Sequence, residues 1–167
     1  IDTEVLSVEL SNGVTKTPQT KNPEGIITIA AQSDKAIQFS GNADSKMDFG
    51  ANAVAAPSNF SLEFKVFPTN NTNAFQGLIG NSPSDAASRS LSVYITQATA
   101  LEIGFGSGSW NPVTTGSLLT LNAWNHVAVT FDGTLLKVYI NGLLKHTDSK
   151  YAGQIPVSTP IRYIGKT

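Results

Sequence analysis

The chain has 167 residues, a formal net charge of −1 and no cysteine. A chain of this length is expected to form one domain with its own hydrophobic core, and its near-neutral charge gives no cationic field for nucleic acid or anionic membranes. The absence of cysteine excludes disulfides, thiolate metal sites and thiol nucleophiles, and no apolar run is long enough for a membrane span.

Short apolar segments recur along the chain, separated by turns rich in glycine, proline and asparagine, and no segment keeps a helical period. This spacing is typical of an antiparallel β-sandwich or jelly roll. We therefore predict an all-β fold built of two antiparallel sheets. In chain order, the predicted strands are residues 5–10, 26–31, 60–67, 77–80, 91–96, 101–105, 127–131, 136–140 and 143–146, with exposed loops at 83–88 and 106–116.

Residues 121–147 contain the clearest local pattern, two strands joined by a tight turn. Apolar side chains alternate with small or polar ones before the turn and again after it, which is the two-residue period of a strand. Asp132-Gly133 lies between the two halves, and Asn141-Gly142 ends the second. Because glycine tolerates the positive φ that short hairpins require, we predict a tight turn at each pair.

The same stretch carries a resemblance to a known family. It runs Trp-x-His-Val-Ala-Val-Thr-Phe-Asp-Gly over residues 124–133 and Leu-Lys-Val-Tyr-Ile-Asn-Gly over residues 136–142. This pattern resembles the laminin-G-like, concanavalin A-like jelly-roll modules. Similar segments at residues 36–41, 60–68 and 161–165 extend the resemblance along most of the chain, and it implies strands at 36–41 and 161–165 as well.

The resemblance implies that residues 1–167 form one jelly-roll sandwich of laminin-G-like type, with Trp124 closing one end of the core. Related modules continue into a further strand beyond the Ile-Gly segment, whereas this sequence stops at Thr167. We expect the last strand to be lacking or rearranged, with its place taken by residues 1–6 or by a neighbouring segment or chain, because an open sheet edge favours strand exchange. Many such modules belong to secreted proteins, so an extracellular or cell-surface location is expected.

Catalytic machinery of the kinds found on this fold is absent from the sequence. A glycosidase needs two carboxylates around the scissile bond, and the laminarinase-like enzymes of this architecture carry Glu-x-Asp-x-Glu on one strand. Here Glu63 and Glu102 each stand alone on their predicted strands. Neither His126 nor His146 lies in a pattern typical of a polysaccharide lyase. We therefore predict a binding module and not an enzyme, although the module can be attached to one.

Calcium is the cofactor that the resemblance suggests, since related modules often hold one Ca²⁺ at the sandwich rim through aspartate and backbone oxygens. The sequence has no dense Asp-x-Asp-x-Asp run, and aspartates are also typical of turns. A bound Ca²⁺ is therefore a hypothesis without an assigned ligand set. Its candidate oxygen donors are Asp34, Asp44, Asp48, Asp85, Asp132 and Asp148.

Sugar binding requires an aromatic face for the C–H groups of a sugar ring and polar side chains for its hydroxyls. Trp110 and Asn111 follow a Gly-Ser-Gly-Ser run and precede a proline, which places them on an exposed loop. A tryptophan displayed there favours a binding role, because a large exposed apolar surface is costly. The alternative, that Trp110 folds back and covers the end of the sandwich, is equally open.

Strand alternation supplies the remaining candidates. If every second residue of 91–95 faces the core, Tyr94 faces outward, and the same period turns Glu102 outward from the next strand. Arg89 and Asn81 lie beside these strands and can reach a hydroxyl or carboxylate, although a solvated loop charge is the simpler role for Arg89. The predicted ligand site consists of Trp110, Asn111, Tyr94, Arg89, Glu102 and Asn81.

These observations predict a lectin-like, non-catalytic module that targets a secreted or surface protein to an oligo- or polysaccharide. The alternative is a protein–protein adhesion or assembly module, for example an appendage subunit, which an absent last strand would favour. A structural spacer is a third hypothesis. None of the three involves nucleic acid or membrane insertion.

Overall fold

The computed structural model describes residues 5–6, 36–40, 45–50, 54–55, 58–72, 75–81, 89–106, 109–156 and 159–165. Regular structure in these residues is almost all β-strand, as predicted, with the 3₁₀ turn Gln97–Thr99 between two strands. No helix in this part of the chain is long and apolar enough to span a bilayer. The strands are β1 (Val5–Leu6), β2 (Met47–Asp48), β3 (Val54–Ala55), β4 (Phe60–Val66), β5 (Phe75–Gly80), β6 (Ser92–Thr96), β7 (Ala100–Gly104), β8 (Val113–Ser117), β9 (Asn125–Phe131), β10 (Leu136–Ile140), β11 (Leu143–Asp148), β12 (Pro160–Ile161) and β13 (Tyr163–Ile164).

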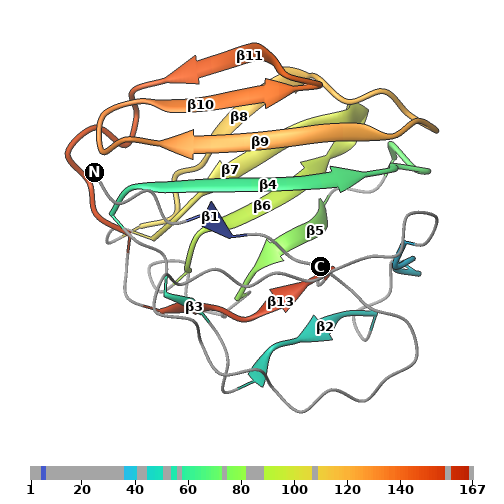
Figure 1. The fold of residues 1–167 in the computed structure, drawn as a ribbon, viewed down its shortest axis with the longest axis horizontal. Coiled ribbons are helices and arrows are strands. Elements are labelled where there is room, and N and C mark those ends of the chain that lie inside the picture. The colour runs from blue at the N-terminus through green and yellow to red at the C-terminus, as the bar shows by residue number, and fades with distance from the viewer. Residues whose placement is uncertain are drawn as a thin grey trace.

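Two sheets stack face to face, which confirms the predicted sandwich (Figure 1). The five-stranded sheet has the order β1-β4-β9-β10-β11, and the six-stranded sheet has the order β2-β13-β5-β6-β7-β8. In Figure 1, strands β4, β9, β10 and β11 lie in front of β5, β6, β7 and β8. β12 and β3 form a separate antiparallel pair, and the short pairing of β1 with β4 is parallel.

The core lies between the sheets because the long strands alternate buried and more exposed side chains. In β9, Val127, Val129 and Phe131 are buried against the facing sheet, whereas the residues between them are partly exposed. Phe105, just after β7, joins the two layers, since its ring centroid lies 5.6 Å from that of Phe131 and 4.2 Å from that of Tyr151. Burial of such large rings supplies much of the hydrophobic stabilisation of the sandwich.

Both predicted tight turns are present. Gly133 has a φ of 87°, and the residues at 141–142 have φ angles of 52° and 78°. The carboxylate of Asp132 accepts the backbone N–H groups of Thr134 at 2.9 Å and Leu135 at 2.7 Å. The hydrogen bonds from Leu135 and Thr134 favour the ionised carboxylate and hold the pKa of Asp132 below its usual value. Asp132 therefore has the turn role predicted for it.

Some predicted elements are wrong or lie outside the described residues. Residues 36–40 are not in a strand, and the predicted loop at 106–116 contains the start of β8. Apart from Val113, β8 is built of threonine, glycine and serine, so it lacks the apolar alternation that reveals a strand. The predicted strand at 26–31 falls outside the described residues, and only Val5–Leu6 of the first predicted strand are described, beside β4.

Trp124 does not close the core, contrary to the prediction. Its side chain is 54% exposed and packs edge-on against Phe67, with ring centroids 5.6 Å apart. The inward position next to it belongs to Asn125, which is fully buried and bonded to the backbone of the preceding turn. Because strand residues alternate between faces, burial of Asn125 turns Trp124 to the outer face of the five-stranded sheet.

Candidate functional site

The outer face of the six-stranded sheet carries most of the predicted site residues. The strand register places Tyr94 of β6 between Gly77 of β5 and Glu102 of β7, and it places Glu102 beside Thr114 of β8. Directly opposed residues share a face of the sheet, and Val93, the neighbour of Tyr94, is fully buried in the core. Alternation therefore predicted the outward direction of Tyr94 and Glu102 correctly.

Phe75 adds a ring to this face that the sequence did not reveal. β5 begins two residues before the predicted strand, and Phe75 lies opposite Thr96. The pairing shifts between Gly77 and Ile79, so that Ile79 is buried in the core while Phe75 is 52% exposed. Strict alternation from Ile79 would put Phe75 in the core, and only the bulge reverses this.

Trp110 lies on top of Tyr94. The two rings meet nearly at right angles, with centroids 6.3 Å apart, and the indole Nε1–H donates a long hydrogen bond to Oε1 of Glu102 at 3.4 Å. Trp110 is thus half-buried on the sheet face, and neither free in solvent nor over the end of the sandwich. Phe75 packs on Tyr94 at a centroid distance of 6.0 Å. Tyr94 is only 7% exposed, so although it faces outward as predicted, it supports Trp110 and offers little surface to a ligand.

Arg89 stacks on the same indole. Its Cζ lies 4.8 Å from the ring centroid of Trp110, the geometry of a cation–π contact. The backbone around it is fixed, because Gly106 donates its N–H to the Arg89 carbonyl at 2.7 Å and Ser90 donates its N–H to Oδ1 of Asn81 at 3.0 Å. Asn81 therefore holds the entry to β6. The simpler role considered for Arg89, a solvated charge on a loop, does not fit, because the residue is partly buried against Trp110.

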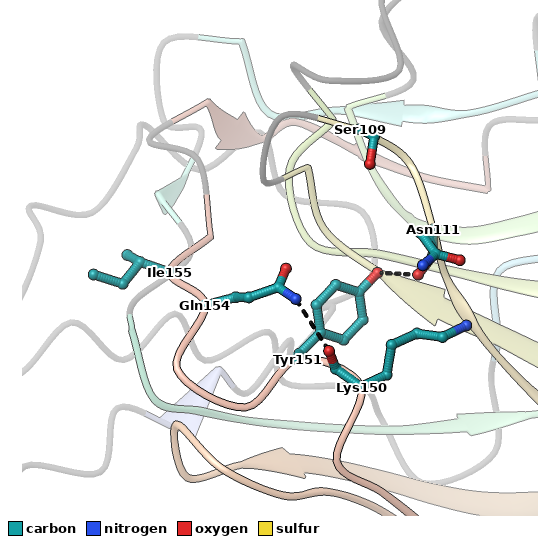
Figure 2. Close-up of a pocket in the computed structure, with 6 residues that line it drawn as sticks. All are labelled: Ser109, Asn111, Lys150, Tyr151, Gln154 and Ile155. Atoms are coloured by element: carbon teal, nitrogen blue, oxygen red, sulfur yellow. Dashed lines mark hydrogen bonds between the residues drawn. The ribbon is translucent and has the colours of Figure 1, made fainter.

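A cleft of about 280 Å³ opens beside the loop that carries Trp110 (Figure 2). The hydroxyl of Tyr151 donates to the carbonyl of Asn111 at 3.0 Å, and Nζ of Lys150 donates to the carbonyl of Pro112 at 2.7 Å. In Figure 2 the Tyr151 ring lies between Gln154 and Asn111. These bonds anchor the loop at 109–112 to the segment that follows β11. The cleft is lined by Ser109, Asn111, Lys150, Tyr151, Gln154 and Ile155.

Four of the six predicted residues therefore form one cluster on the sheet face: Tyr94, Glu102, Trp110 and Arg89. Asn81 positions the backbone next to Arg89, and the exposed side chain of Asn111 lines the cleft. The neighbouring residues that sequence reasoning missed are Phe75, Thr114, Lys150 and Gln154. Lys150 and Gln154 are distant in sequence from the loop they adjoin, so no local pattern marks them.

Three of the aspartates considered for Ca²⁺ have structural roles. Asp48 accepts the N–H of Gly50 at 2.8 Å and pairs with the guanidinium of Arg162 at 2.8 and 3.0 Å. The Arg162 and Gly50 hydrogen bonds hold the pKa of Asp48 below its usual value. Asp148 accepts the N–H of Lys150, and Asp132 lies in its turn. Within the described ranges, no three His, Asp or Glu side chains gather as metal ligands. Calcium stays a prediction, because Asp34, Asp44 and Asp85 lie outside those ranges.

Comparison with known folds supports the architecture. The fold is similar to the CBM40 module of the Ruminococcus gnavus IT-sialidase, solved bound to α2,3 sialyllactose, with a TM-score of 0.56, 20% identity and 74% of each chain covered. It is also similar to the binding domain of Paraclostridial Mosquitocidal Protein 1, with a TM-score of 0.53 and 16% identity over 78% of this chain and 38% of that one. None of the curated proteins compared matches the sequence.

A laminin G family model, described as the concanavalin A-like lectin/glucanases superfamily, matches residues 39–167. The match covers most of the chain, including every strand from β2 to β13. It agrees with the family resemblance seen in the sequence at residues 124–133 and 136–142. The chain belongs to the concanavalin A-like lectin/glucanases superfamily, within its laminin G branch.

Proposed function

We propose that the domain is a non-catalytic carbohydrate-binding module, and that an oligo- or polysaccharide lies along the outer face of the six-stranded sheet. The observation that carries the proposal is Trp110, which a polar loop holds over Tyr94 and beside Glu102. Phe75, half-exposed, continues the aromatic surface beyond Tyr94. Rings beside polar side chains suit a sugar, whose C–H groups pack on aromatics while its hydroxyls take hydrogen bonds.

Each side chain has a role that its geometry allows. The exposed parts of Trp110 and Phe75 contact C–H groups of the sugar, and Tyr94 keeps Trp110 in place beneath them. Glu102 accepts hydrogen bonds from hydroxyls, and the exposed amide of Asn111 both donates and accepts. Because such bonds replace bonds to water, the affinity of one module is modest. Several modules in tandem would raise it through multivalency.

A binding role without catalysis is supported by the cross-strand neighbours of Glu102, neither of which is a second carboxylate. The cross-strand neighbours of Glu102 are Tyr94 and Thr114, whereas a glycosidase places two carboxylates around the bond it cleaves. The R. gnavus module of similar fold holds an oligosaccharide, so the architecture is compatible with sugar binding. In this proposal the domain is extracellular and holds an attached enzyme or surface protein near a glycan.

A glycan-binding screen tests the proposal with two matched tryptophan variants. Trp110→Ala removes the ring from the proposed face, whereas Trp124→Ala removes a tryptophan that is 54% exposed on the opposite sheet. We expect the wild type and Trp124→Ala to bind the same glycans, and Trp110→Ala to bind at least about tenfold more weakly while still unfolding cooperatively. Equal loss in both variants, or no binding by the folded wild type, would contradict the proposal. Binding abolished by chelator and restored by Ca²⁺ would support the calcium hypothesis.

A protein–protein assembly module is the second candidate, because the opposite sheet exposes apolar side chains. Phe67, Trp124, Leu143 and Leu144 are between 41% and 62% exposed, and they lie at the ends of β4, β9 and β11. Exposed apolar groups of this kind are typical of interaction surfaces. Sedimentation velocity over a wide concentration range tests self-assembly: oligomers that Trp124→Ala dissociates would support it, and a monomer at every concentration contradicts it.

A further inference from the structure

We propose that the sheet face around Trp110 selects glycans that carry a carboxylate, and that Arg89 binds the anion. The inference rests on the proposed sugar-binding function and adds to it the chemical class of the ligand. Sialic acid and the uronic acids share this chemistry, and the experiment below separates them.

Among the described residues, Arg89 is a cation held in place without a counter-charge. No hydrogen bond or ion pair joins its guanidinium to another described residue, and its Nε is enclosed without any hydrogen-bond partner there. Glu102, the carboxylate on the same face, is instead bonded to Trp110, whose indole N–H it accepts. Enclosure removes part of the hydration of the guanidinium, and an anion at its terminal nitrogens stabilises the charge that has lost this hydration.

The geometry prepares Arg89 to receive an anion. The guanidinium lies 4.8 Å from the Trp110 ring centroid, and the Arg89 carbonyl is fixed by the N–H of Gly106. Stacking removes part of the hydration of the cation and limits its rotamers, so a ligand has less desolvation and ordering to overcome. Because Nε is enclosed and the residue as a whole is only partly exposed, a ligand reaches the group through its terminal nitrogens.

A carboxylate uses this group better than a hydroxyl does. Two carboxylate oxygens match the planar fork of the guanidinium, and charge-assisted bonds are roughly twice as strong as neutral ones. A second cation borders the same loop, since Lys150 is bonded to the carbonyl of Pro112. Arg89 and Lys150 thus both contact the loop that carries Trp110 and Asn111.

The negative charge of Glu102 repels a carboxylate on the ligand. A carboxylate on the sugar must approach Arg89 and keep away from Glu102, which restricts the direction in which the sugar can lie. Glu102→Gln removes this repulsion while its amide oxygen still accepts the indole N–H of Trp110. A merely structural role for Glu102 would not predict tighter binding in this variant.

The test is calorimetric titration of the whole domain with two matched ligand pairs, sialyllactose with lactose and oligogalacturonate with its methyl ester. We expect the charged member of one pair to bind at least about tenfold more tightly than its neutral partner, and this preference to weaken between about 50 and 500 mM NaCl. The pair that shows the preference identifies the sugar. Arg89→Gln abolishes the preference, Arg89→Lys restores part of it, and Glu102→Gln increases the affinity for the charged ligand a few-fold. Thermal unfolding confirms that each variant is folded.

Equal binding of charged and neutral ligands by the wild type would overturn the inference, and so would a preference that survives Arg89→Gln. If neutral ligands still bind in a Trp110-dependent manner, the proposed sugar-binding function stands and only the anionic selectivity fails. No binding of any glycan by the folded wild type would overturn both.

Discussion

Replacing Tyr151 by phenylalanine removes one hydrogen bond and leaves the core packing intact. The hydroxyl donates to the carbonyl of Asn111 at 3.0 Å, while the ring, only 2% exposed, packs against Phe105 at a centroid distance of 4.2 Å. Tyr151→Phe keeps the ring and loses the bond. We expect the free energy of unfolding at pH 7 to fall by about 1 kcal/mol, which lowers Tm by about 2–4 °C in a domain of this size.

The same substitution changes the response to alkaline pH. Burial raises the pKa of Tyr151 to about 12, from about 10 in an unfolded chain. The folded state therefore holds the phenolic proton more tightly than the unfolded state does. This contribution to stability is fully present below about pH 10 and is lost as the pH rises toward 12. Wild-type stability should consequently fall more steeply than that of Tyr151→Phe in this window.

Urea denaturation of the two proteins at pH 7 and at intervals between about pH 9.5 and 11.5 measures both effects. Groups other than Tyr151 titrate alike in the two proteins, so their contributions cancel in the difference. The stability gap between them should be about 1 kcal/mol at pH 7, should narrow as the pH rises above about 10, and should change sign before about pH 11.5, because the wild type alone loses the contribution of the raised pKa of Tyr151. A gap of zero at pH 7 together with parallel profiles at alkaline pH would refute the buried, hydrogen-bonded state of the hydroxyl.

Two further substitutions test the sandwich itself. Asn125→Ala breaks three hydrogen bonds between a fully buried amide and the preceding turn, and it should lower the free energy of unfolding by about 3 kcal/mol in urea denaturation. As a control, replacing the exposed Asn111 by alanine should lower it by less than about 0.5 kcal/mol. Similar losses in the two variants would contradict the buried, hydrogen-bonded state of Asn125. The guanidinium of Arg162 and the N–H of Gly50 lower the pKa of Asp48, so its contribution to stability is present above about pH 4 and is lost as the pH falls through the lowered value. Asp48→Asn should flatten that acid limb in thermal melts between about pH 5 and 2, and an unchanged limb would show that the ion pair does not stabilise the fold.

The two-sheet architecture could be predicted because β4, β9 and β10 alternate apolar and polar residues so regularly. Their turns carry glycine where the backbone has a positive φ, as at Gly133. The same rule also predicted the direction of Tyr94 and Glu102. The predicted burial of Trp124 was wrong, because Asn125 occupies the inward position. The side-chain amide of Asn125 can be buried there because the backbone of the preceding turn supplies its hydrogen-bond partners.

The details of the candidate site could not be predicted, because they depend on contacts across the sheet. The bulge in β5 that turns Phe75 outward leaves no mark in the sequence. β8 was missed because its side chains are mostly small and polar. That Trp110 covers Tyr94, and that Arg89 covers Trp110, follows only once three separate segments are placed side by side.

The most direct test of the central claim is an NMR titration that observes the two tryptophan indole N–H resonances while a bound glycan is added. The chain has two tryptophans, one on each outer face of the sandwich, so the two signals report the two faces separately. The account predicts that the Trp110 signal shifts in a saturable way, because its Nε1–H contacts Glu102 within the proposed site, and that the Trp124 signal does not move. A saturable shift of Trp124 alone would place the sugar on the five-stranded sheet and contradict the account.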